Sequence, residues 1–122
     1  MLQVAPDADI ETEVEDKTDD ALYCAACGAL VTRGRWRLSI DGDEHTFTNP
    51  VGVSFRIVCF TKAPGVGSSG DKTVEHTWFR GYRWNFANCR GCGDHLGWHY
   101  TGAASPPEFF GLIKLKLSDR PL

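Results

Sequence analysis

The sequence has no apolar run near the ~18 residues that a membrane-spanning helix needs, and no helical pattern longer than about two turns. It also lacks a strong net charge, since 13 basic and 16 acidic residues leave −3 at pH 7. These absences exclude a transmembrane helix and a coiled coil, and they leave no basic footprint of the kind that binds nucleic acid. The 122 residues, 42% of them hydrophobic, are instead typical of one globular domain.

The first twenty residues lack aromatic side chains and are strongly acidic, with eight Asp or Glu residues against one base, Lys17. Such a segment has too little apolar surface to bury. We therefore predict a disordered acidic tail over residues 1–20 and a globular domain over residues 21–122. The segment also lacks the basic start and apolar stretch of a secretory signal, so we expect a cytoplasmic protein.

The remaining sequence favours short strands. Large apolar side chains fall on every second residue in several segments, which indicates half-buried strands. We predict strands over residues 35–40, 53–60, 82–86, 96–100 and 109–117. A hairpin-type turn at Asp41-Gly42 and a loop over residues 63–70, rich in Gly, Pro and Ser, lie between them. The predicted fold class is all-β, with antiparallel strands.

Four of the five cysteines form two Cys-x-x-Cys-Gly motifs, at Cys24, Cys27, Cys89 and Cys92. Two residues between thiolates allow one turn to present both sulfurs to one ion, so the motifs predict a closed, structural site for one Zn²⁺. The alternatives are two disulfides, which no secretory signal supports, and a redox pair, which a doubled motif suits less well. Cys59 shares a predicted strand face with Phe55 and Ile57, and we expect it to be a buried small hydrophobe rather than a reactive thiol.

Three of the four tryptophans, Trp78, Trp84 and Trp98, fall near the second cysteine pair. Strand alternation places Tyr100 on the same face as Trp98, so three indoles and a phenol could wall one pocket. The alternative is that these rings simply fill the core. A cage of this kind holds either a cation, such as methyl-lysine or choline, or a flat neutral ring. A cation reader often adds an acid, for which Glu75 and Asp94 are the candidates.

Several longer motifs occur in a fixed order. The stretch Val74–Trp84 (VEHTWFRGYRW) leads through the second cysteine pair to His95–Tyr100 (HLGWHY). These motifs resemble the CULT domain, the thalidomide-binding domain of the cereblon family. Tyr23–Cys27, Thr48–Pro50 and Phe109–Leu112 are similar to further parts of that domain, so the resemblance covers residues 22–117. Val51 and Arg80 depart from the family pattern, at peripheral positions.

The resemblance implies a β-tent, in which two antiparallel sheets lean together at roughly right angles and one zinc ion, held by the four cysteines, pins them. It also implies that Trp78, Trp84 and Trp98 form a three-walled cage with Tyr100 at its base. The implied ligands are glutarimides and related cyclic imides, either as drugs of the thalidomide class or at protein C-termini. Further ligand-binding residues that the resemblance implies are His76, Glu75 at the rim, and Asn49 and Pro50 in a flanking loop.

The predicted function is a non-enzymatic binding module for cyclic imides, in a stand-alone, bacterial-type member of the family. We expect neither nucleic acid nor membrane as a partner, and the sequence contains no segment resembling the one that docks cereblon onto a ubiquitin ligase. One alternative is an enzyme similar to methionine sulfoxide reductase, which shares the β-tent and the cysteine pairs but needs a reactive cysteine, here Cys59. A second is a methyl-lysine or choline reader that uses the same cage. A third is RNA binding, which the +4 charge of residues 21–122 (12 bases, 8 acids) permits but no basic run supports.

Overall fold

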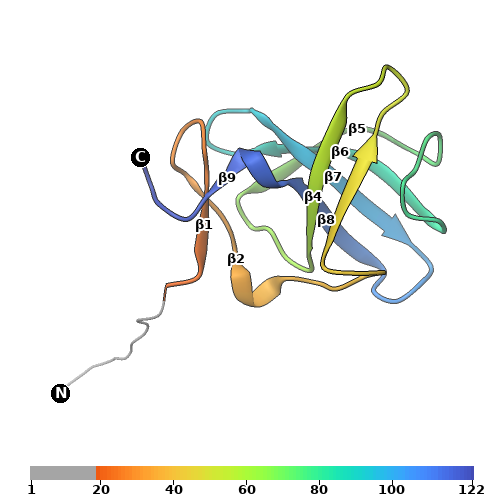
Figure 1. Cartoon of the computed structure of the whole chain (residues 1–122), viewed down its shortest axis with the longest axis horizontal. Coiled ribbons are helices and arrows are strands. Elements are labelled where there is room, and N and C mark those ends of the chain that lie inside the picture. Colours follow the sequence, from red (N-terminus) through yellow and green to blue (C-terminus); the bar gives the residue numbers. More distant parts are fainter. Residues whose placement is uncertain (1–18) are drawn as a thin grey trace.

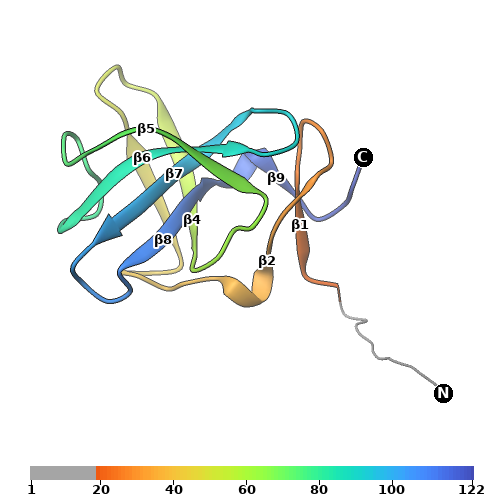
Figure 2. The same ribbon diagram turned by 180° about the vertical axis from the view of Figure 1, so that it is seen from behind.

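The computed structural model describes residues 19–122, in which nine strands form two antiparallel sheets (Figures 1 and 2). The strands are β1 (Ala21–Cys24), β2 (Leu30–Arg33), β3 (Glu44–Thr48), β4 (Ser54–Phe60), β5 (Val66–Thr73), β6 (Tyr82–Cys89), β7 (His95–Gly102), β8 (Glu108–Ile113) and β9 (Leu117–Ser118). Two short 3₁₀ helices are η2 (Gly34–Trp36) and η3 (Lys114–Lys116). The small sheet has the order β2-β1-β9, and the large sheet has the order β3-β4-β8-β7-β6-β5. The predicted all-β fold class with two antiparallel sheets is confirmed.

The large sheet separates two apolar cores, because successive side chains of a strand point to opposite faces. On β4, Val58 and Phe60 belong to the core that also contains Val31 of the small sheet. Ile57 and Cys59 belong to the other core, which is mostly aromatic. Cys59 is fully buried, as its strand position predicts. The aromatic face therefore lies on the side of the large sheet away from the small sheet.

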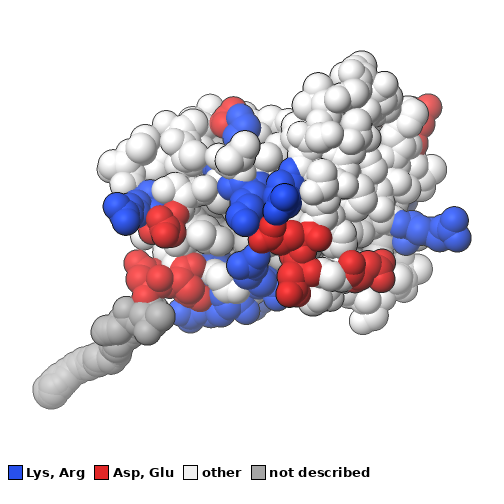
Figure 3. All heavy atoms as spheres, in the orientation of Figure 1, with Lys and Arg blue, Asp and Glu red and all other residues white. Residues whose placement is uncertain are grey.

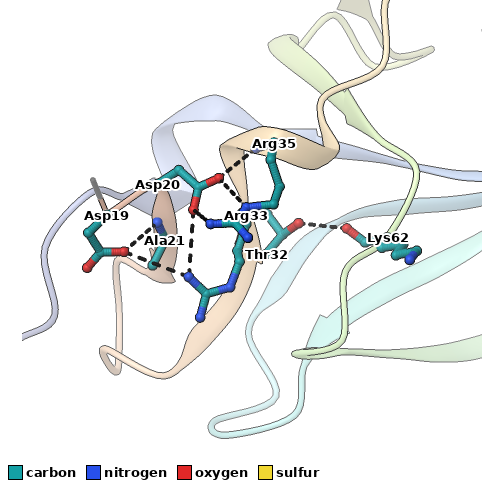
Figure 4. Close-up of polar contacts among 7 residues, drawn as sticks. All are labelled: Asp19, Asp20, Ala21, Thr32, Arg33, Arg35 and Lys62. Atoms are coloured by element: carbon teal, nitrogen blue, oxygen red, sulfur yellow. Dashed lines mark hydrogen bonds and ion pairs between the residues drawn. The ribbon is translucent and has the colours of Figure 1, made fainter. Parts of the chain in front are cut away.

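Charged hydrogen bonds tie the start of the described chain to the segment after β2 (Figure 4). The Asp20 carboxylate accepts from the main-chain N–H of Arg35 at 2.8 Å and from its guanidinium at 2.9 and 3.1 Å. This bonding lowers the pKa of Asp20 to about 2. Arg33 lies 3.8 Å from Asp19 and 3.6 Å from Asp20. Of the acidic tail predicted over residues 1–20, residues 1–18 lie outside the described residues, while Asp20 is held at the edge of the domain.

The prediction of a strand over residues 35–40 is wrong. Asp20 holds the main chain of Gly34 and Arg35, and the chain makes the 3₁₀ turn of η2 at that point. The following residues run irregularly beside the end of β4, where the Leu38 N–H donates to the Cys59 carbonyl at 2.9 Å. The side chains nevertheless alternate between half-buried and exposed along residues 35–40. The Asp41-Gly42 turn is present, but it follows this irregular segment and does not connect two regular strands.

The prediction of a loop over residues 63–70 is wrong from residue 66 onward, because β5 begins at Val66. Ser68 pairs with Ala87 and Ser69 with Phe86, and a bulge interrupts the register between Ser69 and Thr73. Main-chain pairing with β6 outweighs the low strand propensity of Gly and Ser. The predicted strand over residues 109–117 is split by η3 into β8 and β9, whereas the segments 53–60, 82–86 and 96–100 fall on β4, β6 and β7. Within the described part of the chain, no helix has the length and apolar character needed to cross a membrane.

Gly97 on β7 packs directly against β8, so a side chain at this position is expected to destabilise the fold. A Cβ there would overlap the Gly111 carbonyl oxygen and lie 2.9 Å from the Leu112 Cα. We expect Gly97→Ala to lower the free energy of unfolding by about 1–3 kcal/mol in chemical denaturation, because the two strands must move apart. Gly67→Ala is the matched control, since a Cβ there meets only the Arg90 Cγ, at 3.8 Å. Equal losses in the two variants would contradict this account.

Candidate functional site

Each Cys-x-x-Cys-Gly motif forms the same tight turn, the first after β1 and the second after β6. In the first, the Cys24 N–H donates to the Ala29 carbonyl and the Gly28 N–H donates to the Cys24 carbonyl, both at 2.8 Å. The equivalent bonds of the second motif are also 2.8 Å long. Gly28 and Gly93 have φ angles of 80° and 81°, a left-handed conformation that glycine adopts at little cost. This backbone requirement accounts for the glycine that follows each cysteine pair.

The two turns bring the four predicted ligand sulfurs together. The Sγ atoms of Cys24 and Cys92 are 3.8 Å apart and those of Cys27 and Cys89 are 3.6 Å apart, and all four lie within 4.8 Å of one another. Sulfurs bonded tetrahedrally to one zinc at about 2.3 Å are about 3.8 Å apart, whereas a disulfide bond is about 2.05 Å long. The four-cysteine cluster could therefore hold a metal ion such as zinc.

The four-cysteine cluster joins the two sheets. Cys24 ends β1 in the small sheet, and Cys89 ends β6 in the large sheet. The main-chain N–H groups of Ala29 and Gly91 donate to the sulfurs of Cys27 and Cys89, at 3.4 and 3.3 Å. Such donors stabilise the thiolate, which is the form that binds a metal. A bound ion would thus connect elements that are far apart in the sequence.

A cavity of about 360 Å³ lies on the aromatic face of the large sheet. The residues that line it are Asn49, Pro50, Phe55, His76, Trp78, Trp84, Phe86, His95, Trp98 and Tyr100. Seven of the eight residues predicted to bind a ligand are among them, and the eighth, Glu75, is not. The structure thus brings the three indoles around one space, although their part in binding stays a prediction.

Close aromatic packing fixes two walls of this aromatic cavity. The ring centroids of Trp78 and Trp98 are 4.8 Å apart, with 77° between the ring planes. The Phe47 ring stacks on the Trp78 ring, with 4.9 Å between the ring centroids. The Phe55 ring packs edge-on against the Trp98 ring, with 5.4 Å between the centroids. Walls that are held in place before a ligand arrives lower the ordering cost of binding.

The third wall, Trp84, also holds the turn between β5 and β6. Its Nε1–H donates to the Glu75 carbonyl at 2.8 Å, and the Glu75 N–H donates to the Thr73 hydroxyl at 3.0 Å. Strand pairing places Trp84 opposite Thr73 on one side and Tyr100 on the other. Glu75 is therefore joined to the cavity wall through its main chain.

The turn between β5 and β6 also carries hydrogen-bonding groups without protein partners. The main-chain N–H and C=O groups of His76 and Trp78 make no hydrogen bond to another residue within 19–122. Both residues line the aromatic cavity. His76 has a left-handed φ of 58°, uncommon for a residue other than glycine, and the neighbouring Thr77 N–H donates to the Val74 carbonyl at 3.2 Å. This segment can therefore offer donors and acceptors to a ligand.

Three lining residues were not predicted from the sequence: Phe55, Phe86 and His95. The two phenylalanines follow the strand alternation of β4 and β6, which could have identified them. His95 has no such signal. Its Nε2–H donates to the Gly97 carbonyl at 2.8 Å, and burial lowers its pKa, so the ring is neutral at pH 7 and its Nδ1 can accept a hydrogen bond.

One rim of the aromatic cavity is the hairpin turn between β3 and β4. The Asn49 side-chain oxygen accepts from the N–H groups of Val51 and Val53, at 3.1 and 2.9 Å, which makes the turn compact. Residues 46–55 contain no Asp, Glu, Lys or Arg. Figure 3 accordingly shows no charged side chain at the tip of this hairpin. The rim is therefore suited to uncharged contacts.

The similarities of this chain to known proteins are to individual sequences. No family model matches the chain. The chain is 38% identical to cereblon of Gallus gallus over 106 residues, or 82% of its length, and 35% identical to cereblon of Danio rerio over 113 residues, or 88%. It is 29% identical to cereblon of Drosophila grimshawi over 107 residues.

The chain spans only 24% of the length of the first of these relatives and 26% of the second. The similarity, together with the four-cysteine cluster and the aromatic cavity, supports a cereblon-type domain in this protein.

Proposed function

We propose that residues 21–122 form a non-enzymatic binding module that captures cyclic imides of the glutarimide type in the aromatic cavity. Candidate ligands are drugs of the thalidomide class and cyclic imides at protein C-termini. The observation that carries this proposal is that three indoles line one cavity of about 360 Å³, beside main-chain groups of His76 and Trp78 that have no hydrogen-bond partner among residues 19–122. A cavity of this size is at the small end of the usual range for small-molecule sites.

The chemistry of the ligand fits these groups. A glutarimide has one N–H between two carbonyls, so it needs an acceptor flanked by donors, and the segment from His76 to Trp78 offers both kinds of group. Each such hydrogen bond contributes about 0.5–1.5 kcal/mol net. The CH₂ edge of the ring can pack between indole faces, where apolar burial contributes about 25 cal/mol per Å². Affinity in the micromolar range is expected for so small a ligand.

The lining favours a neutral ring over a cation. Neither candidate acid, Glu75 or Asp94, lines the cavity. Asp94 instead pairs with Lys116, whose Nζ lies 3.1 Å from its carboxylate. A methyl-lysine or choline would therefore find aromatic faces but no lining carboxylate. The cation reader remains the second candidate because the same cage could hold a cation.

A sulfoxide reductase is disfavoured because its reactive cysteine is missing from the cavity. Cys59, the spare thiol, is not among the lining residues. Burial raises the pKa of the Cys59 thiol to about 12, so the thiol stays protonated at neutral pH. Since the thiolate is the nucleophilic form, Cys59 is unsuited to attack a sulfoxide.

We assign the four-cysteine cluster to one structural Zn²⁺, because four thiolates leave no open position for a substrate. Within the described residues the cluster is separate from the lining of the aromatic cavity. The metal would hold the scaffold without contacting the ligand. The cytoplasmic location stays a prediction from the sequence.

Titration with thalidomide, followed by tryptophan fluorescence, tests the proposed function. We expect a saturable change, because three of the four tryptophans line the cavity. Trp36→Phe is the matched control, since Trp36 lies outside the cavity and its removal should leave the change intact. Trimethyl-lysine is the competitor. No change at millimolar thalidomide would count against the imide site, and binding of trimethyl-lysine alone would favour a cation reader.

A further inference from the structure

A serine, a histidine and a glutamate meet on the face of the large sheet opposite the aromatic cavity. His99 lies between Trp98 and Tyr100 on β7, so its side chain is on the other face. The Ser68 Oγ on β5 is 2.9 Å from the His99 Nδ1. The Glu108 Oε1 on β8 is 3.2 Å from the His99 Nε2. Strands β5, β7 and β8 of the large sheet, with β6 between β5 and β7, therefore place these three groups in a row.

The surroundings decide where the proton of His99 resides. The Glu108 carboxylate lies 3.2 Å from the His99 Nε2 but outside hydrogen-bond alignment, since this Nε2 has no hydrogen-bond partner within residues 19–122. The negative charge of Glu108 still favours the tautomer that carries its hydrogen on Nε2. The Nδ1 lone pair is then directed to the Ser68 hydroxyl, which can donate to it. Phe110 stacks on the His99 ring at 4.6 Å, with 11° between the planes, and holds its orientation. Burial lowers the pKa of His99, so the neutral, basic form predominates at pH 7.

This row of groups lines a shallow, open depression of about 410 Å³ on the surface. Ser68, His99 and Glu108 all line it, and Ser68 is exposed. Lys62 and Arg90 line the same depression, and the Lys62 Nζ lies over the Trp36 ring, 5.7 Å from its centroid. The Arg90 Nε–H donates to the Pro64 carbonyl at 3.0 Å, which anchors the guanidinium. Positive charge stabilises the oxyanion that forms when a carbonyl carbon is attacked.

We propose that Ser68 is an activated nucleophile that accepts acyl groups from small esters, with His99 as its general base and Glu108 as a positioning residue. The Ser68 Oγ–carbon bond forms as its proton passes to the His99 Nδ1. The ester carbon–oxygen bond then breaks, and the departing alcohol takes that proton. Water then attacks the acyl carbon as its proton passes to the His99 Nδ1. The bond between that carbon and the Ser68 Oγ breaks, the Oγ takes the proton back, and a carboxylic acid leaves. This reactivity is independent of imide binding.

Reaction of the metal-loaded full chain with p-nitrophenyl acetate tests the proposal, with acetylated residues mapped by mass spectrometry. We expect a burst of about one equivalent of p-nitrophenolate and acetylation of Ser68. Ser68→Ala should remove the burst. Ser69→Ala is the matched control, because Ser69 bonds to Asn88 at 2.6 Å and not to a histidine. His99→Gln should slow acetylation of Ser68 roughly 100-fold or more, the usual scale of a general base.

The Glu108→Gln variant tests whether Glu108 acts through its charge on His99 or only supports the fold. The charges that act on His99 are Glu108, which favours its protonation, and Lys72, which opposes it. Loss of the Glu108 charge should therefore shift the pH profile of Ser68 acetylation to lower pH at an unchanged melting temperature. Acetylation of wild-type Ser68 no faster than that of Ser69 would overturn the proposal. So would an unchanged rate in a folded His99→Gln variant.

Discussion

Removal of metal from the four-cysteine cluster is expected to unfold residues 21–122. Structural zinc contributes roughly 10–16 kcal/mol of apparent binding free energy in small domains, whereas whole domains are stable by only about 5–15 kcal/mol. Here the ion would connect Cys24 in the small sheet to Cys89 in the large sheet. Loss of this link leaves the two sheets joined by a modest core.

A melting curve by circular dichroism, with and without a strong zinc chelator, measures this effect. Cys92→Ser, which removes one ligand, should behave like the chelated protein. Cys59→Ala is the matched control, because Cys59 lies in the aromatic core outside the cluster. It should keep a cooperative, chelator-sensitive transition at a somewhat lower temperature. A melting curve that the chelator leaves unchanged would remove the structural-metal assignment.

Trp84→Ala is expected to raise the dissociation constant for thalidomide about 100-fold, or about 3 kcal/mol. The substitution removes one wall of the aromatic cavity and also the hydrogen bond to the Glu75 carbonyl. The freed turn would then no longer present the main chain of His76 and Trp78 in one arrangement. Trp84 is only half-buried, so the fold should tolerate its loss better than the loss of Trp98, which is 8% exposed.

Trp84→Phe separates the two contributions, because phenylalanine keeps an aromatic wall but has no N–H donor. We expect an intermediate loss of affinity, together with faster amide hydrogen exchange in residues 74–78 of the unliganded protein. Trp36→Ala should leave affinity unchanged. Calorimetric titration measures affinity directly and does not depend on the removed fluorophore. Full affinity in Trp84→Ala would show that the ligand binds elsewhere.

Much of the fold and of the candidate site could be predicted from the sequence, because these features follow from residues that are close together in the chain. Two residues between cysteines and a following glycine predict a tight turn that presents both sulfurs on one side, and the hydrogen bonds of Cys24 and Gly28 have that form. Alternation along β4 correctly placed Cys59 in a core. The residues that bind a ligand were predicted partly by alternation and partly by the family resemblance, and seven of the eight line one cavity.

Other features depend on partners that are distant in the sequence. The segment after β2 alternates like a strand, but Asp20 bonds to Arg35 and bends the main chain into a 3₁₀ turn. The start of β5 has the composition of a loop, yet pairing with β6 makes it a strand. Neither outcome is visible in residues 35–40 or 63–70 alone, because a propensity of a few tenths of a kcal/mol yields to a complete set of main-chain hydrogen bonds.

The amino-acid order alone established the class of fold, the two cysteine pairs and the aromatic character of one sheet face, because each depends on periods of two or three residues. The assembled molecule added the closure of the aromatic cavity by Phe55, Phe86 and His95, and the meeting of Ser68, His99 and Glu108. These groups come from separate strands, and their neighbourhood depends on strand order and register. Pairing between β5, β6, β7 and β8 sets the strand order and the register, and no single segment of the sequence encodes this pairing.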